Sequence, residues 1–161
     1  LTLLLFILLQ IRPSDSYALR KKVIQVRTIV DDELGYVASD SEIALRSAYL
    51  LIRKQRVVGL VTAEVIASGY ALQNNFERSR HPRKAMIGIH HMWVHSKFRK
   101  QGIATRLIDA VRERMVFGLV VSPEKVAFSS PTEAGVEFAR RYVNHASHGE
   151  SSKDVLVYDC S

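Results

Sequence analysis

The sequence predicts one α/β domain over residues 1–161, and three observations support this prediction. The chain has 161 residues, of which 47% are hydrophobic, so it can bury one core but not the cores of two ordinary domains. Residues 87–115 have the pattern of a strand, a basic loop and an amphipathic helix. Residues 125–142 have the order strand, polar turn and helix, and no linker indicates a second domain.

The first ten residues are almost wholly apolar. This run is shorter than the roughly 20 residues that a membrane-spanning helix needs. No basic segment precedes it and no small-residue cleavage site follows it, so it does not match a signal peptide either. We therefore expect a buried strand here.

A helix is predicted between Ser16 and Gly35, because Ser14, Asp15 and Ser16 supply N-cap chemistry and Gly35 is a typical stop. Its apolar stripe consists of Leu19, Val23, Val26, Val30 and Leu34.

Two antiparallel strands are predicted next, over 48–52 and 57–66, with a tight polar turn at Lys54 and Gln55. Residues 73–84 are polar and basic without periodicity, so we expect a flexible loop there.

The strand predicted over 87–94 is rich in β-branched and aromatic residues, and its Gly88 indicates a bulge or a close approach. The helix after it has an apolar stripe made of Ile103, Leu107, Ile108, Val111 and Met115. Its other side carries Thr105, Arg106, Asp109, Arg112 and Glu113.

The basic loop between this strand and helix runs from Lys97 to Gly102. A helix start leaves backbone N–H groups unpaired, and a turn closed by glycine lets a bulky anion approach them. The loop is therefore suited to hold phosphate groups, which also fits the formal net charge of +7. A lone Cys160 next to the C-terminus excludes an internal disulfide and a cysteine zinc site.

The second block predicts a short strand over 125–128 and then a helix. Ser130 at the cap, Pro131 at the first position and Glu133 three residues after the cap form a capping box. The apolar face of this helix would be Val136, Phe138, Ala139 and Tyr142. A closing strand is predicted over 155–158.

The spacing of Arg99, Gly102 and Ala104 fits the pattern (Arg or Gln)-x-x-Gly-x-(Gly or Ala) of GNAT-superfamily acetyltransferases. Together, IHHMWVHSKFRKQGIATRLID and KVAFSSPTEAGVEFARRY resemble the GNAT domain of the cohesion-establishment acetyltransferases. The resemblance runs from about Arg12 to Tyr158. It implies a GNAT acyltransferase fold, with a mixed central sheet, a splayed strand pair and flanking helices.

The same resemblance implies acetyl-CoA as the cofactor. The strand backbone at Met92, Trp93 and Val94 would hold the pantetheine arm, which does not conflict with Trp93 being ordinary core. The residues assigned to the pyrophosphate are Lys100, Gln101, Gly102, Ile103, Ala104 and Thr105. The turn assigned to a further acetyl-CoA contact is Thr132, Glu133 and Ala134.

Three residues are candidates for catalysis. Asp109 matches an acidic residue that is thought to assist catalysis in the family, yet it lies opposite the apolar stripe and is equally compatible with a solvated carboxylate. A second acidic position of vertebrate-type members is Ser130 here, which puts a two-carboxylate mechanism in doubt. His90 is an alternative base because imidazole titrates near neutrality, although a strand histidine is more often structural.

The implied function is direct acetyl transfer, in a ternary complex, to lysines on the SMC subunit of cohesin. We expect a nuclear, chromatin-associated protein without a metal or a membrane contact, and chromatin or the replication machinery as further partners. Nucleic-acid binding stays open. The zinc finger that precedes the GNAT domain in the family is absent from this chain or lies upstream of residue 1. Two alternatives remain: a GNAT enzyme for another amine or a histone, and a noncatalytic CoA-binding module.

Overall fold

A computed structural model describes residues 5–34, 46–74, 76–146 and 153–160. These residues group into two compact units. The first contains residues 1–62 and 91–108, and the second contains 63–90 and 109–161. The boundaries fall within strand β3 (Arg56–Val65), strand β6 (Ile87–Val94) and helix α3 (Ile103–Arg114), so each of these elements contributes residues to both units.

The first unit contains the predicted hairpin. Strand β2 (Ser47–Arg53) is followed by Lys54 and Gln55, with φ of 47° and 64°, and then by β3. Two central residues with positive φ form the tight turn that matches the twist of antiparallel strands, so this prediction is confirmed. Strand β1 (Ile7–Ile11) pairs antiparallel with the other edge of β2, from Ile7 opposite Ile52 to Ile11 opposite Ala48.

The apolar N-terminal segment forms strand β1, but the expectation that it is buried is wrong for most of the described part. Leu5 is 72% exposed and Ile7 is 57% exposed, whereas Ile11 is buried. The strand lies at the end of the strand order, so only one of its edges is paired. Hydrophobic composition alone does not bury the outer side chains of such an edge strand.

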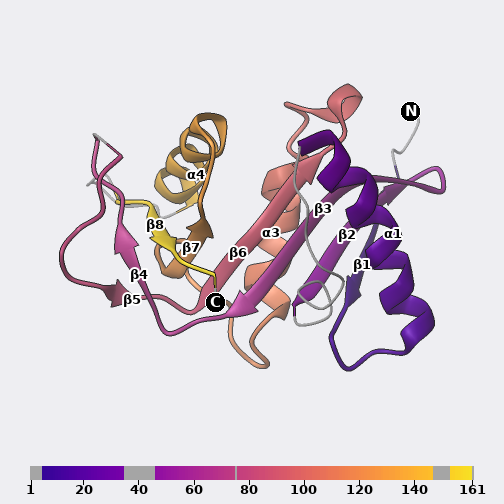
Figure 1. Ribbon diagram of the computed structural model, residues 1–161, viewed down its shortest axis with the longest axis horizontal. Helices are drawn as coiled ribbons and strands as arrows, with labels where there is room; N and C mark the ends of the chain where they lie inside the picture. The colour runs from indigo at the N-terminus through magenta and orange to yellow at the C-terminus, as the bar shows by residue number, and fades with distance from the viewer. Residues whose placement is uncertain (1–4, 35–45, 75, 147–152, 161) are drawn as a thin grey trace. The chain divides into compact units, whose positions relative to one another are not determined.

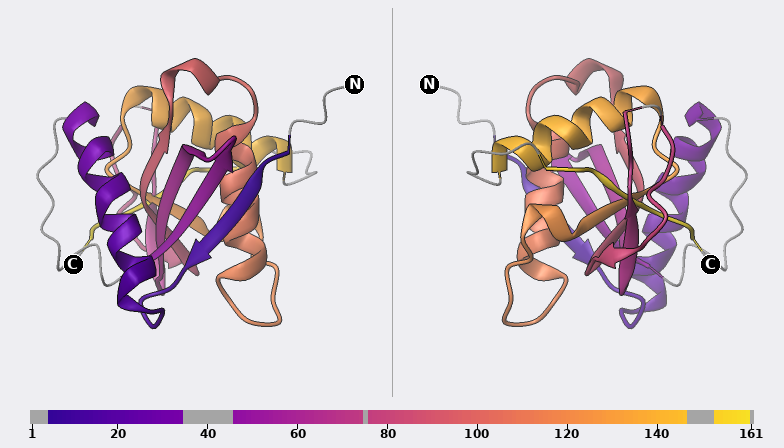
Figure 2. Two further views of the ribbon diagram at one scale, coloured as in Figure 1. Left: turned by 90° about the vertical axis from the view of Figure 1, so that its right-hand side faces the viewer. Right: turned by 90° about the vertical axis from the view of Figure 1, so that its left-hand side faces the viewer.

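Helix α1 (Tyr17–Leu34) confirms the predicted helix, whose predicted stop at Gly35 lies outside the described residues. Its fully buried core residues are Val23 and Val30, and Ile24 and Val26 pack against the same core while partly exposed. They pack with Leu50, Leu60 and Trp93 on one face of the strands of the first unit, while the start of α3 covers the other (Figure 2). Leu19, predicted in the stripe, is 42% exposed. The buried face of α1 instead includes Arg27, which is 1% exposed.

The second unit has a mixed sheet, as expected (Figure 1). Strand β7 (Val126–Ser129) pairs parallel with β6, from Ile87 opposite Val126 to Ile89 opposite Phe128. Beyond that register β6 continues to Val94, whereas β7 ends at Ser129. Strand β8 (Leu156–Tyr158) pairs parallel with β7. Strand β4 (Ser68–Ala71) pairs antiparallel with β8, and β5 (Arg83–Lys84) pairs antiparallel with β4.

Helix α4 (Glu133–Ala146) begins later than the predicted capping box requires. Thr132 is the N-cap, because its Oγ1 accepts from the Gly135 N–H at 3.2 Å and its carbonyl accepts from Val136 N–H at 2.8 Å. Ser130 has φ of 36° and lies two residues before the cap. The capping-box prediction is therefore wrong: the position three residues after the true cap is Gly135, which has no carboxylate.

Residues 73–84 contain more structure than their composition indicates. The backbone N–H of Ser79 donates to Ala71 O at 2.8 Å, and β5 lies at the end of the segment. Arg78 pairs with Asp159 at 2.7 Å and Arg83 with Asp154 at 2.8 Å. The hydrogen bond from Arg78 lowers the pKa of Asp159. The flexibility of this segment stays a prediction.

At Gly88, where a bulge or a close backbone approach is predicted, the close neighbour is a side chain, the Tyr158 ring. A Cβ added at Gly88 would lie 2.5 Å from Cζ of Tyr158, which is 5% exposed and cannot move aside freely. We expect Gly88→Ala to lower the free energy of unfolding by about 1–3 kcal/mol, the usual cost of overpacking. Urea unfolding followed by circular dichroism measures it.

Gly135→Ala is the matched control for this variant. Its Cβ would meet no atom closer than 3.3 Å, and alanine is favoured inside a helix. Equal losses of stability in both variants would contradict the packing explanation.

Candidate functional site

The basic loop of the first unit starts where β6 ends. The His95 N–H donates to Val58 O at 2.9 Å, and His95 Nδ1 accepts from the Lys97 N–H at 3.2 Å. His95 thereby caps the short helix η1 (Ser96–Phe98), whose last N–H donates back to His95 O at 2.8 Å. The loop therefore leaves the strand in a fixed direction.

The second half of the loop turns the chain into α3. Lys100 has φ of 58° and Gly102 has φ of 77°, and Arg99 Nε donates to Val94 O at 3.1 Å. Gly102 O accepts the N–H of Arg106 at 3.0 Å, so the helix starts directly after this glycine. A Cβ added at Gly102 would meet no atom within 4 Å. The space beside Gly102, directly before the first amides of α3, is thus open, as an anion site requires.

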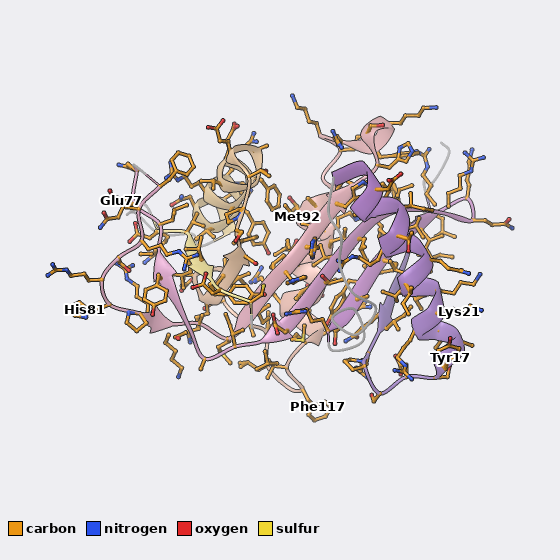
Figure 3. The ribbon with its side chains drawn as sticks, viewed as in Figure 1. Tyr17, Lys21, Glu77, His81, Met92 and Phe117 are labelled. Carbon is orange, nitrogen blue, oxygen red and sulfur yellow. The ribbon has the colours of Figure 1, made fainter. Side chains whose placement is uncertain are left out.

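The strand residues assigned to the pantetheine arm have different environments. Trp93 is 6% exposed and belongs to the core of the first unit, while Met92, labelled in Figure 3, and Val94 are half-buried. Because the proposed contacts use the backbone, the burial of the Trp93 side chain leaves them possible.

Two arginines near the loop were not predicted from the sequence. The Arg53 guanidinium lies 5.2 Å from the Phe98 ring and 5.8 Å from the Phe6 ring, and Arg106 lies 5.0 Å from the same Phe6 ring. Arg53 comes from β2, far from the loop in sequence, so no local pattern could reveal this arrangement. It adds positive charge beside the start of α3.

The second unit holds the candidate catalytic residues. Asp109 Oδ1 accepts from the Tyr142 hydroxyl at 2.6 Å and from Arg112 Nη1 at 3.3 Å. Arg112 Nη1 also donates to the Tyr142 hydroxyl at 3.0 Å. The Asp109 side chain is 43% exposed, so it is neither freely solvated nor buried. The sequence identified Tyr142 only as part of an apolar face.

The environment of Tyr142 keeps its hydroxyl protonated. Burial raises the pKa of Tyr142 well above its usual range, and the hydrogen bond to Asp109 raises it further, while Arg112 acts in the opposite direction. The phenol therefore remains a donor to Asp109 at neutral pH.

The other candidates lie apart from this contact. His90 is half-buried on β6, and Ser130 follows β7. Within the described residues, no hydrogen bond joins Asp109 to either of them. Thr132, Glu133 and Ala134 are exposed at the start of α4.

The described residues contain no group of three or more His, Cys, Asp or Glu side chains that could hold a metal ion. None of the helices described is long and apolar enough to cross a membrane.

Comparison with known proteins identifies the family. The model of the acetyltransferase (GNAT) family matches residues 24–117, and that of the ESCO1/2 acetyl-transferase family matches residues 83–158. Human N-acetyltransferase ESCO1 is 31% identical in an alignment of length 156 that covers 84% of this chain and 19% of that protein. N-acetyltransferase ECO1 of Saccharomyces cerevisiae is 30% identical in an alignment of length 149 that covers 82% of this chain and 53% of that protein.

Solved structures agree with this assignment. The xEco2 acetyltransferase domain bound to a K105-CoA conjugate is 31% identical, with a TM-score of 0.81, and the match covers 96% of this chain and 93% of that one. An aminoglycoside acetyltransferase from a soil metagenome, 14% identical with a TM-score of 0.57 over 97% and 95% of the two chains, shares the fold. The chain therefore belongs to the ESCO/Eco1 acetyltransferase family, and it carries the GNAT domain of that family, for which acetyl-CoA is the cofactor.

Proposed function

We propose that the protein is an acetyl-CoA-dependent protein lysine N-acetyltransferase whose substrate is the SMC subunit of cohesin. The observation that carries the proposal is the match over 96% of the chain to the xEco2 domain bound to a K105-CoA conjugate. A conjugate of a lysine with CoA joins both reactants in one ligand, which supports direct transfer in a ternary complex. The chain spans only 19% of human ESCO1, so the activity of the whole protein is part of this proposal.

The first unit holds the cofactor in this proposal. The open space in front of Gly102, its positive φ and the helix start behind it fit a pyrophosphate. Lys97 and Lys100 add positive charge, and the backbone of Met92–Val94 orients the pantetheine arm. When bound, acetyl-CoA supplies the acetyl group: the lysine nitrogen forms a bond to the thioester carbon, the carbon–sulfur bond breaks, and the thiolate leaves.

Asp109 is the proposed general base. A lysine ammonium with a pKa near 10.4 is mostly protonated at neutral pH, so it must lose a proton before it can attack. Asp109 accepts that proton directly or through a water molecule, and the second proton, which the nitrogen loses as the amide forms, goes to the departing thiolate. His90 is the alternative base. Ser130 has no ionisable group near neutrality, so it can bind or orient a group but cannot replace a carboxylate.

The biological setting is proposed from the family. In this setting the protein is nuclear and chromatin-associated, cohesin is its substrate, and chromatin or the replication machinery are further partners. The test is acetylation of a cohesin SMC head fragment by the full chain with labelled acetyl-CoA. Transfer to free amines or histone tails in place of the cohesin lysines would indicate another GNAT enzyme, and CoA binding without transfer to any of them would indicate a noncatalytic module.

We expect Gly102→Asp to abolish acetyl-CoA binding, because the variant places a negative side chain against the pyrophosphate. Calorimetry measures the affinity. Gly118→Asp is a matched control: Gly118 has φ of 73°, against 77° at Gly102, and neither glycine has an atom within 4 Å of an added Cβ. Both variants introduce the same strain and charge, so equal effects would remove the cofactor assignment.

Binding of acetyl-CoA is expected to weaken as salt rises. Lys97, Arg99 and Lys100 are exposed, and the Debye length falls from about 10 Å at 0.1 M salt to about 3 Å at 1 M. Titrations at the two ionic strengths test this. An affinity that does not change with salt would show that these cations do not contact the phosphates.

We expect Asp109→Asn to slow acetylation by roughly 10²–10⁴-fold, the usual contribution of a general base. Acetyl-CoA affinity should be unchanged, since the asparagine amide oxygen can still accept from Tyr142. The loss should be largest near neutral pH and smaller at high pH, where more substrate lysine is already deprotonated. Steady-state rates between pH 7 and 10 measure this dependence.

Glu113→Gln, an exposed carboxylate one turn along the same helix, is the control and should keep its rate. If His90 is the base, Asp109→Asn keeps nearly full activity and His90→Ala shows the pH-dependent loss. Full activity in both variants would exclude either residue as the base.

A further inference from the structure

The carboxylate of Asp109 is held through one of its two oxygens. Both the Tyr142 hydroxyl, at 2.6 Å, and Arg112 Nη1, at 3.3 Å, donate to Oδ1. In the part of the chain that the structure describes, no hydrogen bond is made to Oδ2 of Asp109. The Asp109 side chain is 43% exposed. We propose that Tyr142 and Arg112 are positioning residues that fix Oδ1 and leave Oδ2 to accept the proton of the substrate amine.

The two donors are themselves immobilised. Arg112 Nε donates to Val121 O at 2.7 Å, and Arg112 O accepts from Val121 N–H at 3.0 Å. The arginine side chain is 16% exposed. The Tyr142 ring stacks on Phe138 with centroids 5.8 Å apart and an interplanar angle of 22°. Side chains fixed in this way can orient a carboxylate, because little conformational freedom remains to be lost when substrate binds.

The charges around Asp109 determine the direction of the pH effect. Arg112 on its own helix and the Tyr142 phenol from α4 both stabilise the ionised carboxylate. Arg106 lies one turn before it, Glu113 lies one turn after it, and the exposed His145 follows Tyr142 on α4. Removing the Tyr142 hydroxyl withdraws one of the two hydrogen bonds that hold the charged carboxylate.

This inference rests on the proposed role of Asp109 as the base, and Tyr142→Phe tests it in the full chain. We expect turnover to fall roughly tenfold, a typical effect of losing one hydrogen bond to a charged group. The KM for acetyl-CoA should stay constant. The acidic limb of the kcat–pH profile should move to higher pH, because the charged form of the proposed base would lose a hydrogen-bond donor.

Tyr158→Phe is the matched control. Tyr158 is also buried in the second unit and its hydroxyl donates to a carboxylate, Glu64 Oε1, at 2.9 Å. Both variants thus lose one phenol–carboxylate bond, and thermal unfolding shows whether they lose comparable stability. Only Tyr142→Phe should shift the acidic limb. In an Asp109→Asn background it should cause little further loss, because the two residues act as one unit.

An unshifted acidic limb in Tyr142→Phe, or a loss that adds fully to that of Asp109→Asn, would overturn the inference while leaving Asp109 as the base. Unchanged turnover in Asp109→Asn alone would overturn both, since no base would then need orienting. If Tyr142→Phe does not fold, Arg112→Lys provides the second test. It keeps a cation but loses the Nε bond to Val121 O, and the same upward shift of the acidic limb is expected.

Discussion

The close contact between α3 and β3 is the constraint on which the proposed chemistry depends. Ile103 and Leu107 are buried against Gly59, where an added Cβ would lie 2.8 Å from each of their side chains. Within the first unit, this contact holds the start of α3, which follows directly after Gly102. Within the second unit, the Tyr142 hydroxyl from α4 donates to Asp109 near the other end of α3. Helix α3 thus contributes to the proposed anion site in the first unit and supplies the proposed base in the second.

The fold was predictable because its main elements have strong local signals. The stripe through Ile103, Leu107 and Val111 has a period that only a helix explains, and all three side chains are buried. The Lys54–Gln55 turn was equally clear, since only four polar residues separate two apolar runs, which favours a tight hairpin. The N-terminal segment shows the limit of such signals. Its strand was predicted, but its exposure follows from its place at the end of the sheet, which depends on the whole topology.

The details of the site were less predictable because they depend on contacts between distant residues. Ser130 and Thr132 have similar capping chemistry, and the backbone geometry, with φ of 36° at Ser130, determines which of them caps α4. Helical periodicity placed Tyr142 on the packed face of α4, but it could not show that its hydroxyl meets a carboxylate 33 residues earlier in the chain. The contacts of Arg53 with the Phe6 and Phe98 rings could not be predicted for the same reason.

The left-handed backbone of Lys100 implies a conflict between folding and the cofactor-binding role proposed for this loop. A residue with a Cβ at φ of 58° costs roughly 1 kcal/mol relative to glycine, and asparagine would also tolerate this conformation better. The chain nevertheless has a lysine there, at the loop that would hold phosphates. Substitutions that relax this turn would make the fold more stable and the loop less cationic. Under the proposed cofactor role of this loop, selection for thermal stability alone should therefore favour variants at position 100 that retain the fold and bind the cofactor less tightly.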